Sequence, residues 1–285
     1  MVWFYLCRNQ CCAKPSNRKH AGYCSNCNAS RSNNITFKNC NQTNLGFDAN
    51  GNYVSEVFKE DGSIIDGVTV IQANTEYNIG GKTRKFWGIM GSNYSKNLTY
   101  DGCKLSRFDA HAGVYNATIK NSDITIAISI TGAGTFTLEN SRVYGQYLTL
   151  LRSDYGATWH GDFVIKNTVF YSRSSTATLF GVSWNEKSYG YQCYMPTNIT
   201  IDGLTLKGAT TAYLFPSSST QKWTKDMWTN ATNSYIPPKT ITIKNSTGTY
   251  YVARYGGVLG FIGGVSQSNH YFGGTTISGA SWKAV

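Results

Sequence analysis

The sequence predicts an all-β chain, a right-handed parallel β-helix solenoid with loop insertions, and three observations support this prediction. A short strand phrase recurs along the chain, and the smallest interval between its copies is 19 residues. Charged residues make up only 14% of the chain. Glycine occurs 29 times, and few charges with many glycines are typical of turn-rich β proteins.

The recurring phrase has seven residues in which apolar and polar side chains alternate. Its second and fourth positions are apolar, which is typical of a strand with one buried face. Asn or Gly at the sixth position tolerates the left-handed backbone conformation of a sharp turn. The copies are Asn34–Cys40, Asn97–Cys103, Asn116–Ser122, Thr135–Ser141, Asp162–Thr168, Asn198–Leu204 and Thr240–Ser246, with a degenerate copy at Gly62–Val68.

The spacing of these copies defines the expected coil. Consecutive copies start 63, 19, 19, 27, 36 and 42 residues apart. A coil of about 19 residues holds three short strands, each paired with its copy one coil away at about 4.8 Å. Longer intervals are coils with inserted loops, and the longest is expected to contain two or three coils. An ordinary β-sandwich would give no reason for one phrase to recur.

Two units are expected along the chain. Residues 1–30 form a Cys-rich N-terminal segment or first coil, and residues 31–285 form a single parallel β-helix domain with an inserted loop around 215–239. Cys24 and Cys27, together with earlier cysteines, have partial zinc-site spacing, so a folding zinc ion, disulfides and plain buried thiols all stay open. Cys40 and Cys103 share one phrase position, which favours a packing role. No cofactor and no catalytic metal are predicted.

The basic charge restricts the choice of partner. The net charge is +11 and the pI is about 9.2. A basic surface of this kind could bind nucleic acid, anionic lipid or an acidic glycan. Basic residues are scattered apart from 18–20 and 82–85, so no nucleic-acid partner is predicted. No apolar run approaches the roughly 18 residues of a membrane span, so no membrane partner is predicted. A polysaccharide, possibly acidic, is the expected partner.

Two segments interrupt the alternating pattern with ionisable groups, and they hold the candidate catalytic residues. When the coils are aligned on the phrase, Ile128 and then Tyr155 take the position of Asp109. Asp109 and Asp154 are therefore expected two coils apart, at roughly 9 to 10 Å. This is close to the carboxyl separation of about 6.5 to 9.5 Å in inverting glycosidases. The two carboxyl groups would act as acid and base, and His111 would tune or relay a proton.

The neighbouring side chains are candidate substrate contacts. Arginine can grip an acidic sugar through two hydrogen bonds, and aromatic rings can stack on sugar rings. The candidates are Arg107, Arg152, Tyr155, Trp159, His160 and Trp87. Three alternatives stay open: a non-catalytic contact with glycan, a structural ladder of Asp–Arg pairs between coils, and a lyase. A lyase usually needs Ca²⁺, for which the sequence has no clustered acidic ligand set.

Three stretches resemble one known group of proteins. They are Lys96–Ser122, Leu150–Phe163 and Gly190–Pro196, within a resemblance that covers roughly residues 30 to 210. They are similar to right-handed β-helices of the pectate-lyase-like superfamily found in gut bacteria and their phages. The relatives of that group include phage tailspikes, polysaccharide lyases and glycoside hydrolases.

The resemblance implies polysaccharide recognition and cleavage, by hydrolysis in preference to elimination. The alternative is a non-catalytic glycan-binding or structural module of a phage tail or bacterial surface protein. Either reading implies an extracellular or virion-associated chain, and tailspike relatives imply a possible homotrimer.

Overall fold

The computed structural model describes residues 33–86, 93–151, 159–182, 193–215, 235–236, 238, 240–251, 253–255, 258–260 and 281–282. Every regular element in these ranges is a β-strand. The same ranges contain no helix of the length and hydropathy that a membrane crossing requires. The expected all-β class is confirmed for this part of the chain. The Cys-rich segment 1–30 and most of the loop at 215–239 lie outside it.

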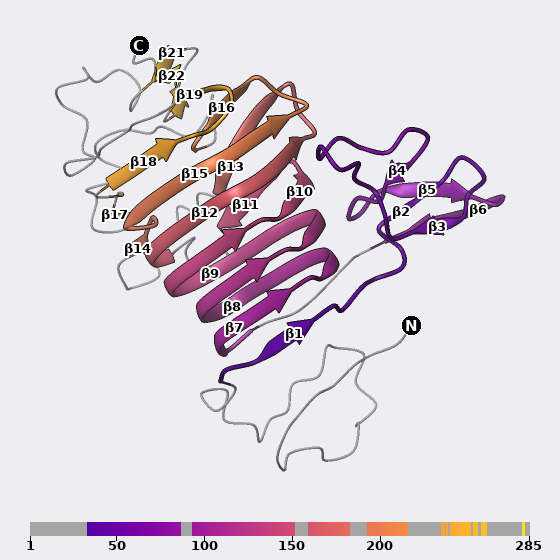
Figure 1. Ribbon diagram of the computed structural model, residues 1–285, viewed down its shortest axis with the longest axis horizontal. Helices are drawn as coiled ribbons and strands as arrows, with labels where there is room; N and C mark the ends of the chain where they lie inside the picture. Colours follow the sequence, from indigo (N-terminus) through magenta and orange to yellow (C-terminus); the bar gives the residue numbers. More distant parts are fainter. Residues whose placement is uncertain are drawn as a thin grey trace.

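A 13-stranded parallel sheet dominates the fold, and it is strongly curled (Figure 1). Its strands are β1 (Thr36–Lys38), β7 (Ser95–Asp101), β8 (Lys104–Lys120), β9 (Asp123–Glu139), β10 (Arg142–Gly145), β11 (Tyr147–Leu151), β12 (Trp159–Ser172), β13 (Thr176–Val182), β15 (Asn198–Lys207), β16 (Thr211–Tyr213), β18 (Thr240–Lys244), β19 (Thr249–Tyr251) and β22 (Ser281–Trp282). Strand β9 pairs with β8 on one side and with β10, β11 and β12 on the other. The turn of the chain that contains β9 therefore pairs with both the preceding turn and the following turn.

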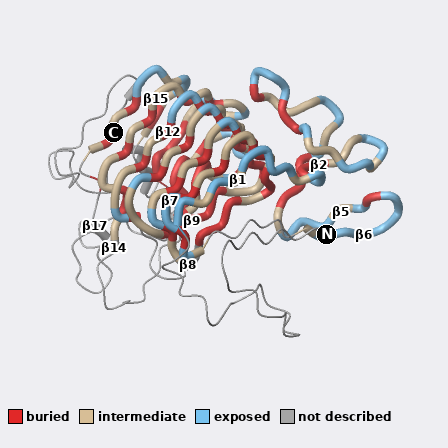
Figure 2. Tube along the Cα trace, turned by 60° about the horizontal axis from the view of Figure 1, so that its bottom comes forward, coloured by how far each residue is buried: buried red, intermediate tan, exposed pale blue. Residues whose placement is uncertain are grey.

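The apolar positions of the phrase build the core of this sheet. In the second position, Ala117, Phe136 and Phe163 lie opposite one another on successive turns. All three side chains are buried, and the rings of Phe136 and Phe163 are 4.7 Å apart. Figure 2 shows buried positions recurring side by side on neighbouring strands. Because parallel strands repeat at a fixed spacing, one buried residue per turn produces a continuous column of packed side chains.

The sixth position of the phrase ends each of these strands in a sharp turn. Asn121, Asn140 and Asn167 have φ angles of 52°, 47° and 43°, and Gly203 takes the same place with a φ of 82°. These values lie in the left-handed region, which Asn and Gly tolerate better than other residues. The role expected for this position is confirmed.

Residues 43–86 leave the sheet and form a small antiparallel unit, called here the outer lobe. Its strands are β2 (Gly46–Phe47), β3 (Tyr53–Val54), β4 (Thr69–Val70), β5 (Glu76–Ile79) and β6 (Lys82–Lys85). The lobe has a separate core around Leu45, Val57, Phe58 and Val70. Tyr144 and Tyr171 of the sheet pack against that core, so the lobe lies against the outer side of the sheet (Figure 1).

The longest interval between copies of the phrase was expected to contain two or three coils, and this expectation is wrong. Strand β1 pairs directly with β7, with Thr36 opposite Thr99, so these two copies of the phrase are neighbours. Within residues 41–86 the expected extra coils do not form. Phe58 and Ile64 make an antiparallel bridge across the degenerate copy, which places Gly62–Val68 in a lobe hairpin.

Four further strands form two small pairs. Strand β14 (Cys193–Tyr194) pairs in parallel with β17 (Tyr235–Ile236). Strand β20 (Ala253–Tyr255) pairs in antiparallel fashion with β21 (Val258–Gly260).

Candidate functional site

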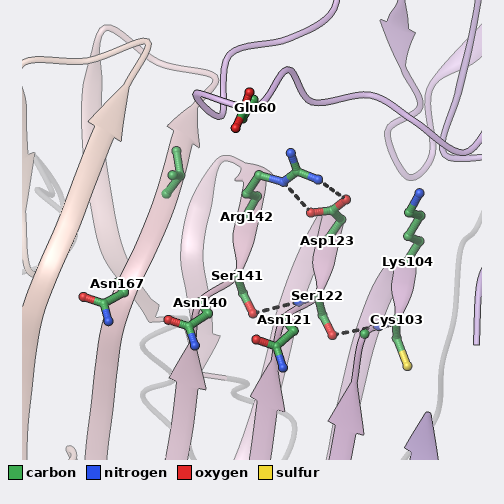
Figure 3. A pocket seen from close by; sticks show the side chains of 12 residues that line it. Glu60, Cys103, Lys104, Asn121, Ser122, Asp123, Asn140, Ser141, Arg142 and Asn167 are labelled. Carbon is green, nitrogen blue, oxygen red and sulfur yellow. Dashed lines mark hydrogen bonds and ion pairs between the residues drawn. The ribbon is translucent and has the colours of Figure 1, made fainter. Parts of the chain in front are cut away.

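A groove lies where the turns of the sheet face the outer lobe, and its volume is about 520 Å³ (Figure 3). The sheet supplies four successive turns to its wall, and the lobe supplies a single side chain. The lining residues are Glu60, Gly102, Cys103, Lys104, Asn121, Ser122, Asp123, Asn140, Ser141, Arg142, Asn167 and Val169. Most of them are polar, which suits a hydrophilic ligand.

A column of amide side chains runs along the groove. Asn121, Asn140 and Asn167 occupy the same turn position on successive coils, and Figure 3 shows their side chains in a row. Asn121 Nδ2 donates a hydrogen bond to Asp101 Oδ1 at 2.8 Å. This bond is the main reason why the pKa of Asp101 lies below its usual range.

A second column, made of hydroxyl groups, forms part of the same wall. The backbone N–H of Cys103 donates to Ser122 Oγ at 3.0 Å, and the N–H of Ser122 donates to Ser141 Oγ at 3.1 Å. Each serine hydroxyl donates in turn to the carbonyl two residues earlier. Both serines are only 2% exposed. Because these hydroxyls are committed to the backbone, they hold the turns together and are unsuited to act as nucleophiles.

The charged groups of the groove are largely neutralised by one another. Arg142 Nε and Nη2 contact the two carboxylate oxygens of Asp123 at 2.7 and 2.8 Å (Figure 3). Arg142 Nη1 also donates to the backbone oxygen of Lys59 in the lobe at 3.0 Å. Lys104 pairs with Glu56. Glu60, at the rim, is exposed to solvent.

The ion pair between Asp123 and Arg142 could have been predicted from the sequence. Asp123 and Arg142 follow two copies of the phrase and are 19 residues apart, the length of one coil. Opposite charges at that interval predict an ion pair between neighbouring turns. The role of the lobe residue Glu60 had no such signal, because the lobe does not follow the repeat.

Asp109 occupies a different setting from the groove. Its side chain is 7% exposed, and Arg107 Nη2 lies 2.9 Å from its Oδ2. The two residues are two apart on β8 and share one face of the strand. The expected ladder paired Asp with Arg between coils, whereas this ion pair joins two residues of one strand. The side chain of His111, on the same strand, lies outside the described side chains.

The expected alignment of Asp109 with Ile128 is wrong. Strand β8 shifts against β9 at irregularities, so Asp109 lies opposite Ser129, one residue beyond Ile128. Ser129 in turn lies opposite Leu150. An added residue in one strand shifts the pairing until later irregularities restore it, as they do by Ala117, which lies opposite Phe136. Asp154, Arg152, Tyr155 and Trp87 lie outside the described residues.

Trp159 and His160 are neighbours in the chain, but one side chain is buried and the other is exposed. Trp159 is fully buried, its ring packs edge-on against Phe136 and Phe163, and its Nε1 donates to two backbone oxygens. Its expected contact with sugar is therefore wrong, because the core holds the ring. His160 is exposed, and its ring stacks on Tyr194 at 4.0 Å with an interplanar angle of 10°.

The described residues contain no group of three or more His, Cys, Asp or Glu side chains able to hold a metal ion. Comparisons with protein-family models, with curated proteins and with solved structures gave no match to this chain.

Proposed function

We propose that this chain is a right-handed parallel β-helix that recognises a polysaccharide in the groove between its turns and the outer lobe. The observation that carries the proposal is the column of amides repeated on successive turns beside charges that are already paired. The parallel pairing of each turn with the next supports a β-helix. A right-handed path is favoured because about 98% of parallel crossover connections have that hand.

The chemistry of the groove suits a ligand rich in hydroxyl groups. An amide offers two donors and an acceptor, and a carboxylate such as that of Glu60 accepts from hydroxyls. Because Arg142 and Lys104 are engaged by carboxylates, a bound ligand would not need to neutralise them. A polymer lying along the stack would meet a similar amide on three successive turns, which favours a polysaccharide over a compact ligand.

The same geometry favours recognition over cleavage. Hydrolysis of a glycosidic bond generally needs two carboxyl groups that flank the scissile bond. Of the two carboxylates that line the groove, Asp123 is held in a two-point contact with Arg142 and only Glu60 is exposed. Asp109, the expected catalytic acid or base, is buried beside Arg107. The proposed role is therefore that of a non-catalytic glycan-binding module, such as one of a surface or tail protein.

The proposal can be tested with a pair of matched variants. Asn121 lines the groove and Asn245 does not, yet both have a left-handed backbone, with φ angles of 52° and 51°. Each amide also donates to an aspartate of the preceding coil at 2.8 Å. Replacement by glycine should be tolerated at both, because Gly102 and Gly203 occupy this turn position in two other coils.

Binding to a panel of neutral and acidic polysaccharides is measured by isothermal titration calorimetry. Asn121→Gly should weaken binding by about 5- to 10-fold, which corresponds to the loss of one hydrogen bond. Asn245→Gly should bind like the parent chain although its stability changes by a similar amount. Equal binding by both variants, or no binding by the parent, would refute the proposal. Release of new reducing ends would show that the module cleaves its ligand.

A further inference from the structure

Cys40 and Cys103 lie opposite each other on the first two turns of the sheet. The residues on either side of them are paired, since Lys38 lies opposite Asp101 and Asn41 opposite Lys104. The backbone N–H of Lys104 donates to the carbonyl oxygen of Cys40 at 3.2 Å. The register of the two turns therefore fixes the two cysteines as direct neighbours.

Their sulfur atoms have the same orientation as the hydroxyl groups farther along the column. Cys40 Sγ lies 3.5 Å from the backbone oxygen of Lys38, two residues earlier. The Ser122 hydroxyl likewise contacts the backbone oxygen two residues before it. Cys103 Sγ lies 3.5 Å from the oxygen of Asp101 and also 3.5 Å from that of Phe37, on the turn that carries Cys40. The Cys103 thiol therefore leans towards the preceding turn.

The pKa of the Cys103 thiol lies above its usual range. Burial is the main cause that raises the pKa of its thiol, and the neighbouring Cys40 thiol contributes to the rise. Both residues are thiols in this structure. Cys40 is exposed, whereas Cys103 is fully buried. One partner is thus open to a reagent in solution and the other is sheltered beside it.

We propose that Cys40 and Cys103 form a redox-sensitive disulfide that closes the chain between residues 40 and 103 and fixes the base of the outer lobe. Adjacent parallel strands lie about 4.8 Å apart, within the Cα separation of about 4.4 to 6.8 Å that disulfides span. The bond therefore needs side-chain rotation and no change of register.

The oxidant is a small-molecule disulfide such as glutathione disulfide, and the reaction is a thiol–disulfide exchange. The exposed Cys40 thiolate attacks one sulfur of the reagent and releases a thiolate. Cys103 then loses its proton and attacks Cys40 Sγ, which releases the second thiolate of the reagent. Two protein thiols are oxidised to one disulfide, and one reagent disulfide is reduced to two thiols.

The bond would act on the groove as well as on stability. Cys103 and Lys104 line the groove on the sheet side, and Glu60 lines it on the lobe side. The loop from residue 40 to residue 103 contains the entire outer lobe, so its closure limits how far the lobe can separate from the sheet. A covalent link at the base of a long loop also reduces the entropy of the unfolded chain.

Peptide mapping of the full chain tests this bond directly. The protein is exposed to glutathione disulfide, quenched with acid, alkylated and digested with trypsin without reduction. Cleavage after lysines gives peptide 39–59 with Cys40 and peptide 97–104 with Cys103. The two peptides should be recovered as one linked species that separates on reduction. Cys103→Ser is the control, since Ser122 and Ser141 show that serine fits this column.

Thermal unfolding provides the second measurement. A dithiol reductant should lower the unfolding midpoint of the oxidised parent by about 5 to 10 °C. The unfolding midpoint of Cys103→Ser should not change when the reductant is added, because this variant cannot form the bond. Recovery of Cys40 alkylated, joined to glutathione, or joined to a different cysteine would overturn the proposal. A linked parent with no change in midpoint on reduction would refute the constraint on the lobe.

Discussion

Arg142 joins the outer lobe to the sheet, and its replacement by methionine should separate the two. Its guanidinium makes a two-point contact with Asp123, and it donates to the backbone oxygen of Lys59 at 3.0 Å. It also lies 5.2 Å above the ring of Phe58. Methionine keeps the length and the apolar stem of the side chain, so Arg142→Met removes the charge interactions with little loss of packing.

The expected cost follows from the burial of the partner. The Asp123 side chain is 7% exposed, and loss of one member of a buried pair costs about 3 to 5 kcal/mol. The Arg142 side chain is 28% exposed, so water can partly replace it and the lower part of that range applies. We expect the free energy of unfolding to fall by about 3 kcal/mol, roughly a 150-fold change in the folding equilibrium. Urea unfolding followed by tryptophan fluorescence measures this change.

Two further variants distinguish the physical cause. Asp123→Asn in the Arg142→Met background removes the stranded charge, so the double variant should recover part of the loss. Lys207→Met is the exposed control, because Lys207 Nζ also contacts the lobe at Asp61 Oδ2, at 3.0 Å, but the two side chains are 32% and 59% exposed. It should change stability little. A loss under about 1 kcal/mol for Arg142→Met, or additive losses in the double variant, would refute the reasoning.

Three other changes test the core, the coil and the lobe. Phe163→Ala empties a fully buried column position and should lower the free energy of unfolding by about 3 to 5 kcal/mol, measured by urea unfolding. Gly132→Ala should cost at least about 2 kcal/mol in the same assay, because a Cβ there would lie 2.0 Å from the carbonyl oxygen of Val114; an unchanged midpoint would show that the two turns are farther apart. The pKa of Asp61 is lowered, chiefly by a hydrogen bond from the Ser63 hydroxyl, so its contribution to stability is complete above the unfolded pKa of about 3.9 and is lost as the pH falls below it. The melting temperature of the parent should therefore fall more steeply than that of Asp61→Asn between about pH 4 and pH 2, and parallel curves would contradict this.

The phrase made the repeating part of the fold predictable. Its second and fourth positions form the buried columns, as Phe136 and Phe163 show, and its sixth position forms the left-handed turns. Both features are local, since strand alternation and turn conformation depend on a few adjacent residues. The sequence also placed the groove's amides in register, although their joint role was recognised only in the structure.

The candidate catalytic residues were less predictable for a physical reason. The alignment assumed that equivalent positions lie at a fixed distance before each phrase, whereas irregularities in the pairing of β8 with β9 place Asp109 opposite Ser129. Such a bulge depends on packing between turns and leaves no clear mark in the residues that form it. Trp159 shows the same limit, because a tryptophan beside a histidine suits a sugar contact and a core position equally well.

The amino-acid sequence by itself determined the all-β class, the columns of the core and the turn residues, because these follow from short patterns repeated along the chain. Cys40 and Cys103 share one position in the phrase, but only the direct pairing of β1 with β7 makes them neighbours. Only the tertiary structure decided that residues 43–86 leave the sheet and return to its outer side. It also decided that Asp109 is buried beside Arg107 and that the groove lies between the lobe and the turns. These features arise from contacts between residues far apart in the chain, such as Arg142 and Lys59, and no local pattern specifies them.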